Sequence, residues 1–384
     1  MGSRIVPVST FAASTSTLPD VGQITKNYQV ESPLHPKARE ILGDAIDQGW
    51  ADPRKLSQAS ARARILRDEA VSALSHGLGV PHSQLEFIGE SSQSNYYAVA
   101  GLLGPTDHLI HSALDRKEIH ALGQKHEHTT IVPVNAKGHI DINKELSELH
   151  ADLIALQVSN IETGVTQPVE SIIHELANSR IALDFTAAPP SMAMPSRWDS
   201  AAFDSVSWQG PVGLGVIAIA PSSNWRNPMP HIGAARTPES FSLPLLLASS
   251  VALSAWQEEE KVQSSLLRDL TTTLRNQILT QIPGSSVAGD IGSSLPNISS
   301  ICFVEVEAEE LLRKLDARGF LVDAGSACFA ENIQASHVLA AMGAPSKGNI
   351  RITFHHGTRH EDVTALVEAI SACVSDLRTD SKFA

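Results

Sequence analysis

Apolar and polar positions follow two different periods along this chain of 384 residues. Residues 36–78 place apolar side chains three and four positions apart among Ala, Arg and Glu, which predicts helix. Later apolar runs are short, are separated by helical segments such as 96–104, and predict strands at 85–89, 108–114, 129–134, 151–159, 180–185, 205–208 and 213–220. Strands that alternate with helices predict a mostly parallel sheet with helices on both faces, an α/β fold.

A second pattern begins after residue 243, where the sequence to 282 reads as one long helix or a helix pair. A smaller α+β unit follows, with strands expected at 298–306, 320–325 and 348–354 and helices at 308–319 and 359–377. We therefore expect an N-terminal tail over 1–24, a large α/β domain over 25–245 and a small α+β domain over 246–384.

The formal net charge of −13 argues against general affinity for nucleic acid or for an anionic membrane surface. No apolar run reaches the roughly 18 residues that a membrane span needs, and the Ser/Thr-rich first 24 residues do not resemble a secretory signal. The three cysteines form no CxxC pair, which favours free thiols and a cytoplasmic location.

The most informative segment reads GSACFAENIQASHVLAAMG, from Gly325 to Gly343. Cys328 stands in a Gly/Ser/Ala-rich turn ahead of a short amphipathic helix, a place that suits a thiol that must reach a partner; the alternative is a small buried side chain. The segment resembles the active-site cysteine loop of the cysteine desulfurases, in the class V aminotransferase branch of pyridoxal-phosphate enzymes. The resemblance extends from about Asn27 to Leu377, and GPVGLG at 210–215 is its other specific part.

This resemblance implies the fold type I of the pyridoxal-phosphate-dependent transferases, which is the aspartate aminotransferase-like fold. That fold has a mixed seven-stranded sheet in the large domain and is built as a homodimer with active sites at the subunit interface. The implied activity is sulfur mobilisation from L-cysteine, with alanine as product and a persulfide on Cys328. The implied partners are a second copy or a paralogue, and a sulfur acceptor or scaffold protein.

Several residues match the family's cofactor contacts. Ser91 and Ser92 open a helix after the strand at 85–89, where backbone N–H groups favour a phosphate; simple helix capping is the alternative. By resemblance Asn160 lies beside the cofactor ring and contacts substrate, although a turn role is open. Asp184 ends a strand where the family's acid keeps the pyridine nitrogen protonated, although it could cap a helix.

Three further positions carry expected contacts. By resemblance Ser207 is another cofactor contact, and Thr237 supplies a phosphate contact to the partner subunit. Arg351 matches the arginine that binds the substrate α-carboxylate as a bidentate fork; a salt bridge at the end of a strand is the alternative.

The chain departs from the family where the chemistry depends on it most. The family reads Ser, one residue, His, Lys, two residues and Gly-Pro, whereas residues 206–211 here read Val-Ser-Trp-Gln-Gly-Pro, as if shortened. No His-Lys pair is present, and no lysine occurs between Lys144 and Lys261. The covalent link to the cofactor needs a primary amine on this loop, and the same lysine normally moves the substrate proton.

Other substitutions agree with this loss. Arg116 replaces the histidine that stacks on the ring, and Ala187 replaces the glutamine that touches the ring hydroxyl. Lys117, next to Arg116, carries an amine that could reach the cofactor aldehyde from another side of the expected pocket. No metal site is expected from the scattered histidines.

Two functions follow as hypotheses, and a protein that binds the cofactor without a covalent link is an intermediate third option. One is a desulfurase-like sulfur enzyme with an unusual cofactor loop. The other is a catalytically inactive relative that serves as a binding or regulatory subunit.

Overall fold

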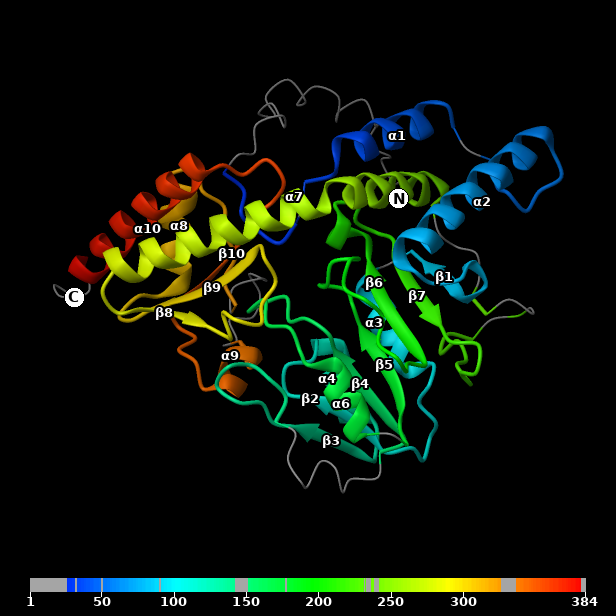
Figure 1. Ribbon diagram of the computed structural model, residues 1–384, viewed down its shortest axis with the longest axis horizontal. Helices are drawn as coiled ribbons and strands as arrows, with labels where there is room; N and C mark the ends of the chain where they lie inside the picture. The colour runs from blue at the N-terminus through cyan, green and yellow to red at the C-terminus, as the bar shows by residue number, and fades with distance from the viewer. Residues whose placement is uncertain are drawn as a thin grey trace, which may run out of the picture.

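The structure, a computed structural model, describes residues 26–31, 33–49, 51–89, 91–141, 151–176, 178–230, 232, 236–237, 242–325 and 336–380. Two packed units share one long helix, α7 (Leu243–Gln281), as Figure 1 shows. The chain has the α/β fold that the sequence predicts.

A seven-stranded sheet forms the larger unit, in the order β1-β7-β6-β5-β4-β2-β3. Strand β7 runs antiparallel to both of its neighbours, and the other pairings are parallel. The strands are β1 (Leu85–Ile88), β2 (Leu109–Ser112), β3 (Thr129–Val132), β4 (Leu153–Gln157), β5 (Arg180–Asp184), β6 (Ser200–Asp204) and β7 (Gly215–Ile219).

Both faces of this sheet are covered, which explains why strands β4 and β7 are buried along their whole length. In β4, Ile154 and Leu156 enter one core while Leu153 and Ala155 enter another on the opposite face, as the two-residue period of a strand requires. One face packs on α3 (Ser91–Ala100) and α4 (Lys117–Lys125). The other packs on α1 (Pro36–Asp47), α2 (Gln58–Leu78), α6 (Val169–Glu175) and the start of α7.

The smaller unit has its own core around a three-stranded antiparallel sheet, in the order β10-β9-β8. Its elements are β8 (Ser285–Ala288), β9 (Ile298–Phe303), α8 (Ala308–Asp316), α9 (His337–Met342), β10 (Asn349–Thr353) and α10 (His360–Asp380). Tyr28 also lies in this core, so the chain begins its described part against the smaller unit.

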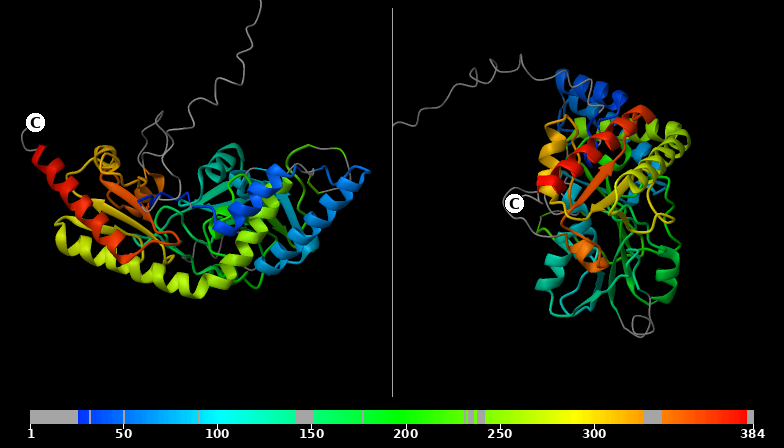
Figure 2. Two further views of the ribbon diagram at one scale, coloured as in Figure 1. Left: turned by 90° about the horizontal axis from the view of Figure 1, so that it is seen from above. Right: turned by 90° about the vertical axis from the view of Figure 1, so that its left-hand side faces the viewer.

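Helix α7 connects the two cores. At roughly 1.5 Å per residue its 39 residues span about 58 Å, and Figure 2 shows it running along one side of both units. Leu253 packs in the first core and Leu270 in the second. We propose that the domain division expected at 245/246 falls inside this helix.

Three details differ from the sequence expectation. Residues 205–208 form a 3₁₀ turn, η5 (Ser205–Trp208), because the Asp204 side chain accepts a hydrogen bond from the Val206 N–H; the strand is β6, just before it. The helical region 36–78 divides into α1 and α2. Residues 320–325 make only isolated bridges, including one between Asp323 and Arg351. A second 3₁₀ turn is η4 (His82–Gln84).

Across the described ranges, each helix is too short or too polar to cross a lipid bilayer.

Candidate functional site

Asp184 lies at the carboxyl end of the central strand β5, as the sequence predicts, and is 3% exposed. Its Oδ1 accepts hydrogen bonds from the Thr186 N–H (2.8 Å) and hydroxyl (2.5 Å). Its Oδ2 accepts one from Arg116 Nε at 3.3 Å. The chain itself therefore engages both oxygens of the carboxylate that the sequence resemblance places beside a cofactor ring.

Arg116 stands at the N-terminus of α4, and its charge balances several acids. Asp184, Glu118 and Asp204 all act electrostatically on it. Burial raises the pKa of the Glu118 carboxyl, and burial together with the charge of Asp184 raises the pKa of Asp115 to about 8. Arg116, which the sequence resemblance aligns with a stacking histidine, thus brings a fixed positive charge to this place.

A cavity of about 130 Å³ lies between the two units and α7. Ser207 and Gln209 line it from η5 and the following turn, and Ala187 and Ile161 line it from the loops after β5 and β4. The Ser207 hydroxyl donates to the Asp204 carbonyl at 2.9 Å. The described lining residues include no lysine or arginine.

The lysine position can be counted on this loop. Counted back from Gly210-Pro211, the family pattern places lysine at Ser207 and histidine at Val206 without any gap. The chain passes continuously from β6 through η5, and Gln209 adopts a left-handed φ of 60° before Gly210. The sequence analysis interpreted this loop as shortened, whereas this count aligns the family's lysine with Ser207.

Asn160 lies in the turn after β4, where its side chain is fully used. Its Oδ1 accepts from the Glu162 and Thr163 N–H groups at 3.0 and 2.9 Å, and its Nδ2 donates to Gln157 Oε1 at 2.9 Å. Asn160 does not line the cavity, whereas the next residue, Ile161, does. These contacts support the turn role that the sequence left open.

The expected phosphate contacts are only partly described. Ser91 and Ser92 begin α3 directly after β1, as expected, but their side chains lie outside the described residues. Thr237 is buried and donates to Glu86 Oε2 at 2.6 Å. Its hydroxyl is therefore engaged within its own chain.

Arg351 lies on β10 and is paired with a carboxylate of the same chain. Its Nη2 and Nε donate to Asp323 Oδ2 at 2.6 and 3.2 Å. Both side chains are nine-tenths buried or more. The salt bridge that the sequence analysis gave as the alternative for Arg351 is therefore present, but its partner, the lone aspartate of the apolar run FLVDAG, was not identified from the sequence.

Cys328 lies outside the described residues, but the two ends of its loop are placed. A Cβ on Gly325 would collide with Glu162 Oε1, and Ser336 accepts the Leu339 N–H and so caps α9. Burial raises the pKa of Glu162, whose carboxyl also interacts with Ser336 and Arg351. Glu162 of the large unit therefore lies between the stems of the cysteine loop.

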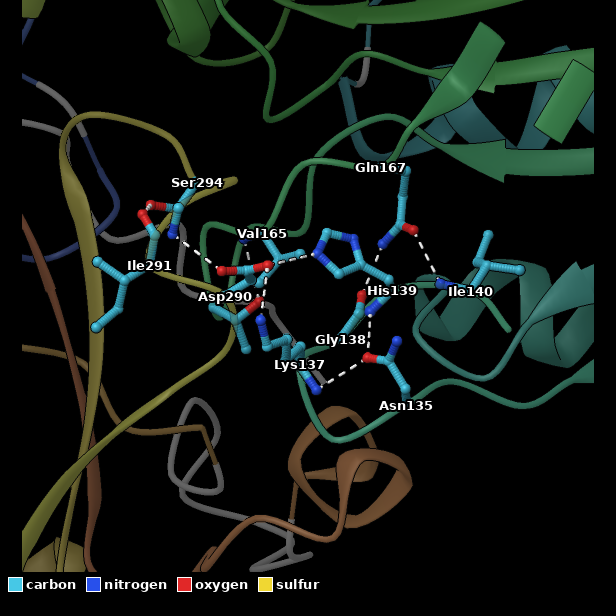
Figure 3. A network of polar contacts seen from close by, with 12 residues as sticks. Asn135, Lys137, Gly138, His139, Ile140, Val165, Gln167, Asp290, Ile291 and Ser294 are labelled. Atoms are coloured by element: carbon cyan, nitrogen blue, oxygen red, sulfur yellow. Dashed lines mark hydrogen bonds and ion pairs between the residues drawn. The ribbon is translucent and has the colours of Figure 1, made fainter. Parts of the chain in front are cut away.

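A second polar contact joins the two units, and Figure 3 shows His139 and Lys137 pointing toward Asp290. His139 Nε2 is 3.1 Å from Asp290 Oδ2, and Lys137 Nζ is 3.7 Å from the same oxygen. Gln167 fixes the turn by accepting the Ile140 N–H and donating to the Gly138 carbonyl. Sequence analysis did not find this contact.

Within the described ranges, no cluster of three or more histidine, cysteine or acidic side chains could hold a metal ion.

The comparisons with known proteins point to one family. The family described as aminotransferase class-V matches residues 47–366. The cysteine desulfurase IscS of Dictyoglomus turgidum is 22% identical, with 94% of this chain and 97% of that protein covered, and a cysteine desulfurase of Cereibacter sphaeroides is 26% identical, with 91% and 95% covered. The structure of a NifS-like protein from Rickettsia africae matches with a TM-score of 0.80 at 17% identity, covering 91% of this chain and 99% of that one.

Proposed function

Because the chain belongs to the aminotransferase class-V family and is similar to cysteine desulfurases over nearly its full length, we propose a function related to theirs without their covalent chemistry. The protein is a cysteine desulfurase-like subunit that is catalytically inactive and binds or regulates within a sulfur-transfer or related complex. The proposal is supported by Ser207, a residue of the cavity wall with which the family's lysine aligns when the pattern is counted back from Gly210-Pro211, and by the lack of any lysine between Lys144 and Lys261.

The family is dependent on pyridoxal phosphate, so the fit of this chain to that cofactor is decisive. Ser207 has no primary amine, and its hydroxyl is used by the Asp204 carbonyl. Arg116 donates to Oδ2 of Asp184 and Thr186 donates to its Oδ1, so both oxygens of this carboxylate are used within the chain. The residues present do not fit a covalently held cofactor, and we derive no desulfuration step through it.

The missing lysine also removes the base that moves the substrate proton. Loss of a positioned acid or base typically costs about 10² to 10⁴ in rate. Val206 at the histidine position and Arg116 at the stacking position do not supply a neutral base near pH 7. What the site retains is a cavity and buried polar groups that suit binding.

Desulfuration with sulfur carried on Cys328 is the second candidate function. It is favoured by the GSAC sequence around that cysteine and by the family to which the chain belongs. It requires an amine from elsewhere in the chain. Lys117, which is exposed and directly follows Arg116, is the candidate that the sequence analysis named.

We further propose that the protein acts in the cytoplasm as a homodimer or as a heterodimer with a paralogue, with a sulfur acceptor or scaffold as partner. A groove between α1, α2 and α7 supports a protein contact, since it is lined by Leu66, Leu243 and Leu247 and has the exposed Leu56 in the nearby loop. Light scattering on the purified chain, alone and with a coexpressed paralogue, measures this assembly.

The test is turnover of L-cysteine by the purified protein supplied with pyridoxal phosphate. We expect neither alanine nor sulfide above the level of a Cys328→Ser variant. Alanine release that depends on Cys328 would establish the second candidate instead.

A further inference from the structure

Asp323 and Arg351 are held together by more than their charges. Their backbones pair in both directions, with Asp323 N–H to Arg351 carbonyl at 3.0 Å and Arg351 N–H to Asp323 carbonyl at 2.8 Å. The Val30 N–H also donates to Asp323 Oδ2 at 2.8 Å. The carboxylate thus accepts from three donors, two on the Arg351 side chain and one on the backbone of Val30.

The guanidinium of Arg351 has few donors left for a ligand. Its Nε and Nη2 both reach Asp323, and its Nη1 lies 3.5 Å from the Ile161 carbonyl. An arginine presents its charge along a planar fork, and here one edge of that fork is filled by a carboxylate of the chain.

Acidic and histidine side chains surround the pair, and Lys117 also acts electrostatically on one of the acids, Glu162. Glu162 interacts with Arg351, and Asp323 acts on the neighbouring His355, whose pKa burial lowers. Asp204 lines the cavity, and the described part of its wall contains no lysine or arginine. Arg351 and Asp323 lie beside this wall rather than in its described lining, next to Ile161 and Val30, which line it. A ligand carboxylate in the cavity would therefore meet the acid Asp204 and find Arg351 already paired.

We propose that Asp323 is a specificity-determining residue that removes carboxylate recognition from this site. It does so by occupying Arg351 from within the chain, so that the site selects small ligands that lack a carboxylate over amino acids. The inference rests on the proposed function, because it assumes that the cavity binds a ligand rather than turning it over.

The test compares L-cysteine with cysteamine, which has the same thiol and amine but no carboxylate. Binding of each is measured by calorimetry on the wild-type full chain and on Asp323→Asn and Asp323→Ser. Asp290→Asn is the matched control, because it removes another acid at the contact between the units, one that pairs with His139. Thermal unfolding shows which variants are folded.

In the wild-type protein we expect L-cysteine to bind no more tightly than cysteamine. In a folded Asp323 variant we expect L-cysteine binding to tighten by about tenfold or more, since a charge-assisted hydrogen bond becomes available. Adding Arg351→Gln should abolish the gain, and Asp290→Asn should show none.

Tenfold tighter binding of L-cysteine than cysteamine by the wild-type protein overturns the proposal, and this measurement needs no variant to fold. A folded Asp323 variant without the gain overturns it too. Both readouts concern carboxylate preference alone. Failure of the proposed function would instead show as alanine release.

Discussion

The ion pair between Arg116 and Asp184 offers a direct test of how the site is held together. The change is Arg116→Leu, which keeps the apolar length of the side chain and removes the guanidinium. Asp184 is 3% exposed, so its charge would remain buried without a cation. Removing one partner of a buried pair typically costs about 3 to 5 kcal/mol.

Two features of the structure place the expected cost near the lower limit. The Arg116 side chain is 23% exposed, which admits some solvent, and Thr186 continues to satisfy Oδ1 of Asp184. We therefore expect the free energy of unfolding to fall by about 3 kcal/mol, a large share of the roughly 5 to 15 kcal/mol of a typical domain.

Urea denaturation followed by fluorescence and circular dichroism measures this cost. Arg54→Leu is the matched control, because its pair with Asp52 is on the surface, where solvent screens the charges, and should contribute much less. In an Asp184→Asn background the Arg116→Leu cost should shrink, since no buried charge is left unpaired. A cost below about 1 kcal/mol, or an equal cost in both backgrounds, would refute the reasoning.

Three further predictions concern stability. Burial raises the pKa of Asp115 to about 8, so between roughly pH 4 and 8 the folded state holds a proton that the unfolded state has lost. The free energy of unfolding should therefore fall as pH rises across this range, by up to about 1.4 kcal/mol per pH unit. The Asp115→Asn variant should flatten that slope in urea titrations. The hydrogen bond from His139 lowers the pKa of Asp290, so its stabilisation should be present above roughly pH 4 and be lost as pH falls below it; Asp290→Asn should remove this acid-side loss in thermal scans. Trp208 is fully buried and donates to the Ser249 carbonyl at 3.2 Å, so Trp208→Ala should cost about 3 to 5 kcal/mol and Trp208→Phe about 1 kcal/mol or slightly more; a Trp208→Phe variant as stable as the wild type would contradict the assigned hydrogen bond.

The fold was largely predictable because strand and helix periods depend on local sequence. The apolar runs at 151–159 and 180–185 became β4 and β5, and the long helix at 243–282 became α7. The run at 205–208 was misassigned because a capping aspartate, rather than apolar content, decides its conformation.

The candidate site was less predictable, since its decisive contacts join distant parts of the chain. Asp184 was placed correctly at a strand end, but its partner Arg116 is 68 positions away. The pair of Arg351 with Asp323 spans 28 positions. Asn160 and Ile161 are adjacent, and only the turn geometry decides which of them faces the cavity.

The central claim is that a serine stands where the family keeps its lysine. The measurement is borohydride reduction of the wild-type protein and of Ser207→Lys after incubation with pyridoxal phosphate, followed by peptide mapping with mass spectrometry. We predict no fixed cofactor on the wild-type chain and labelling of residue 207 in the variant. Stoichiometric labelling of a wild-type lysine, Lys117 included, would contradict the account.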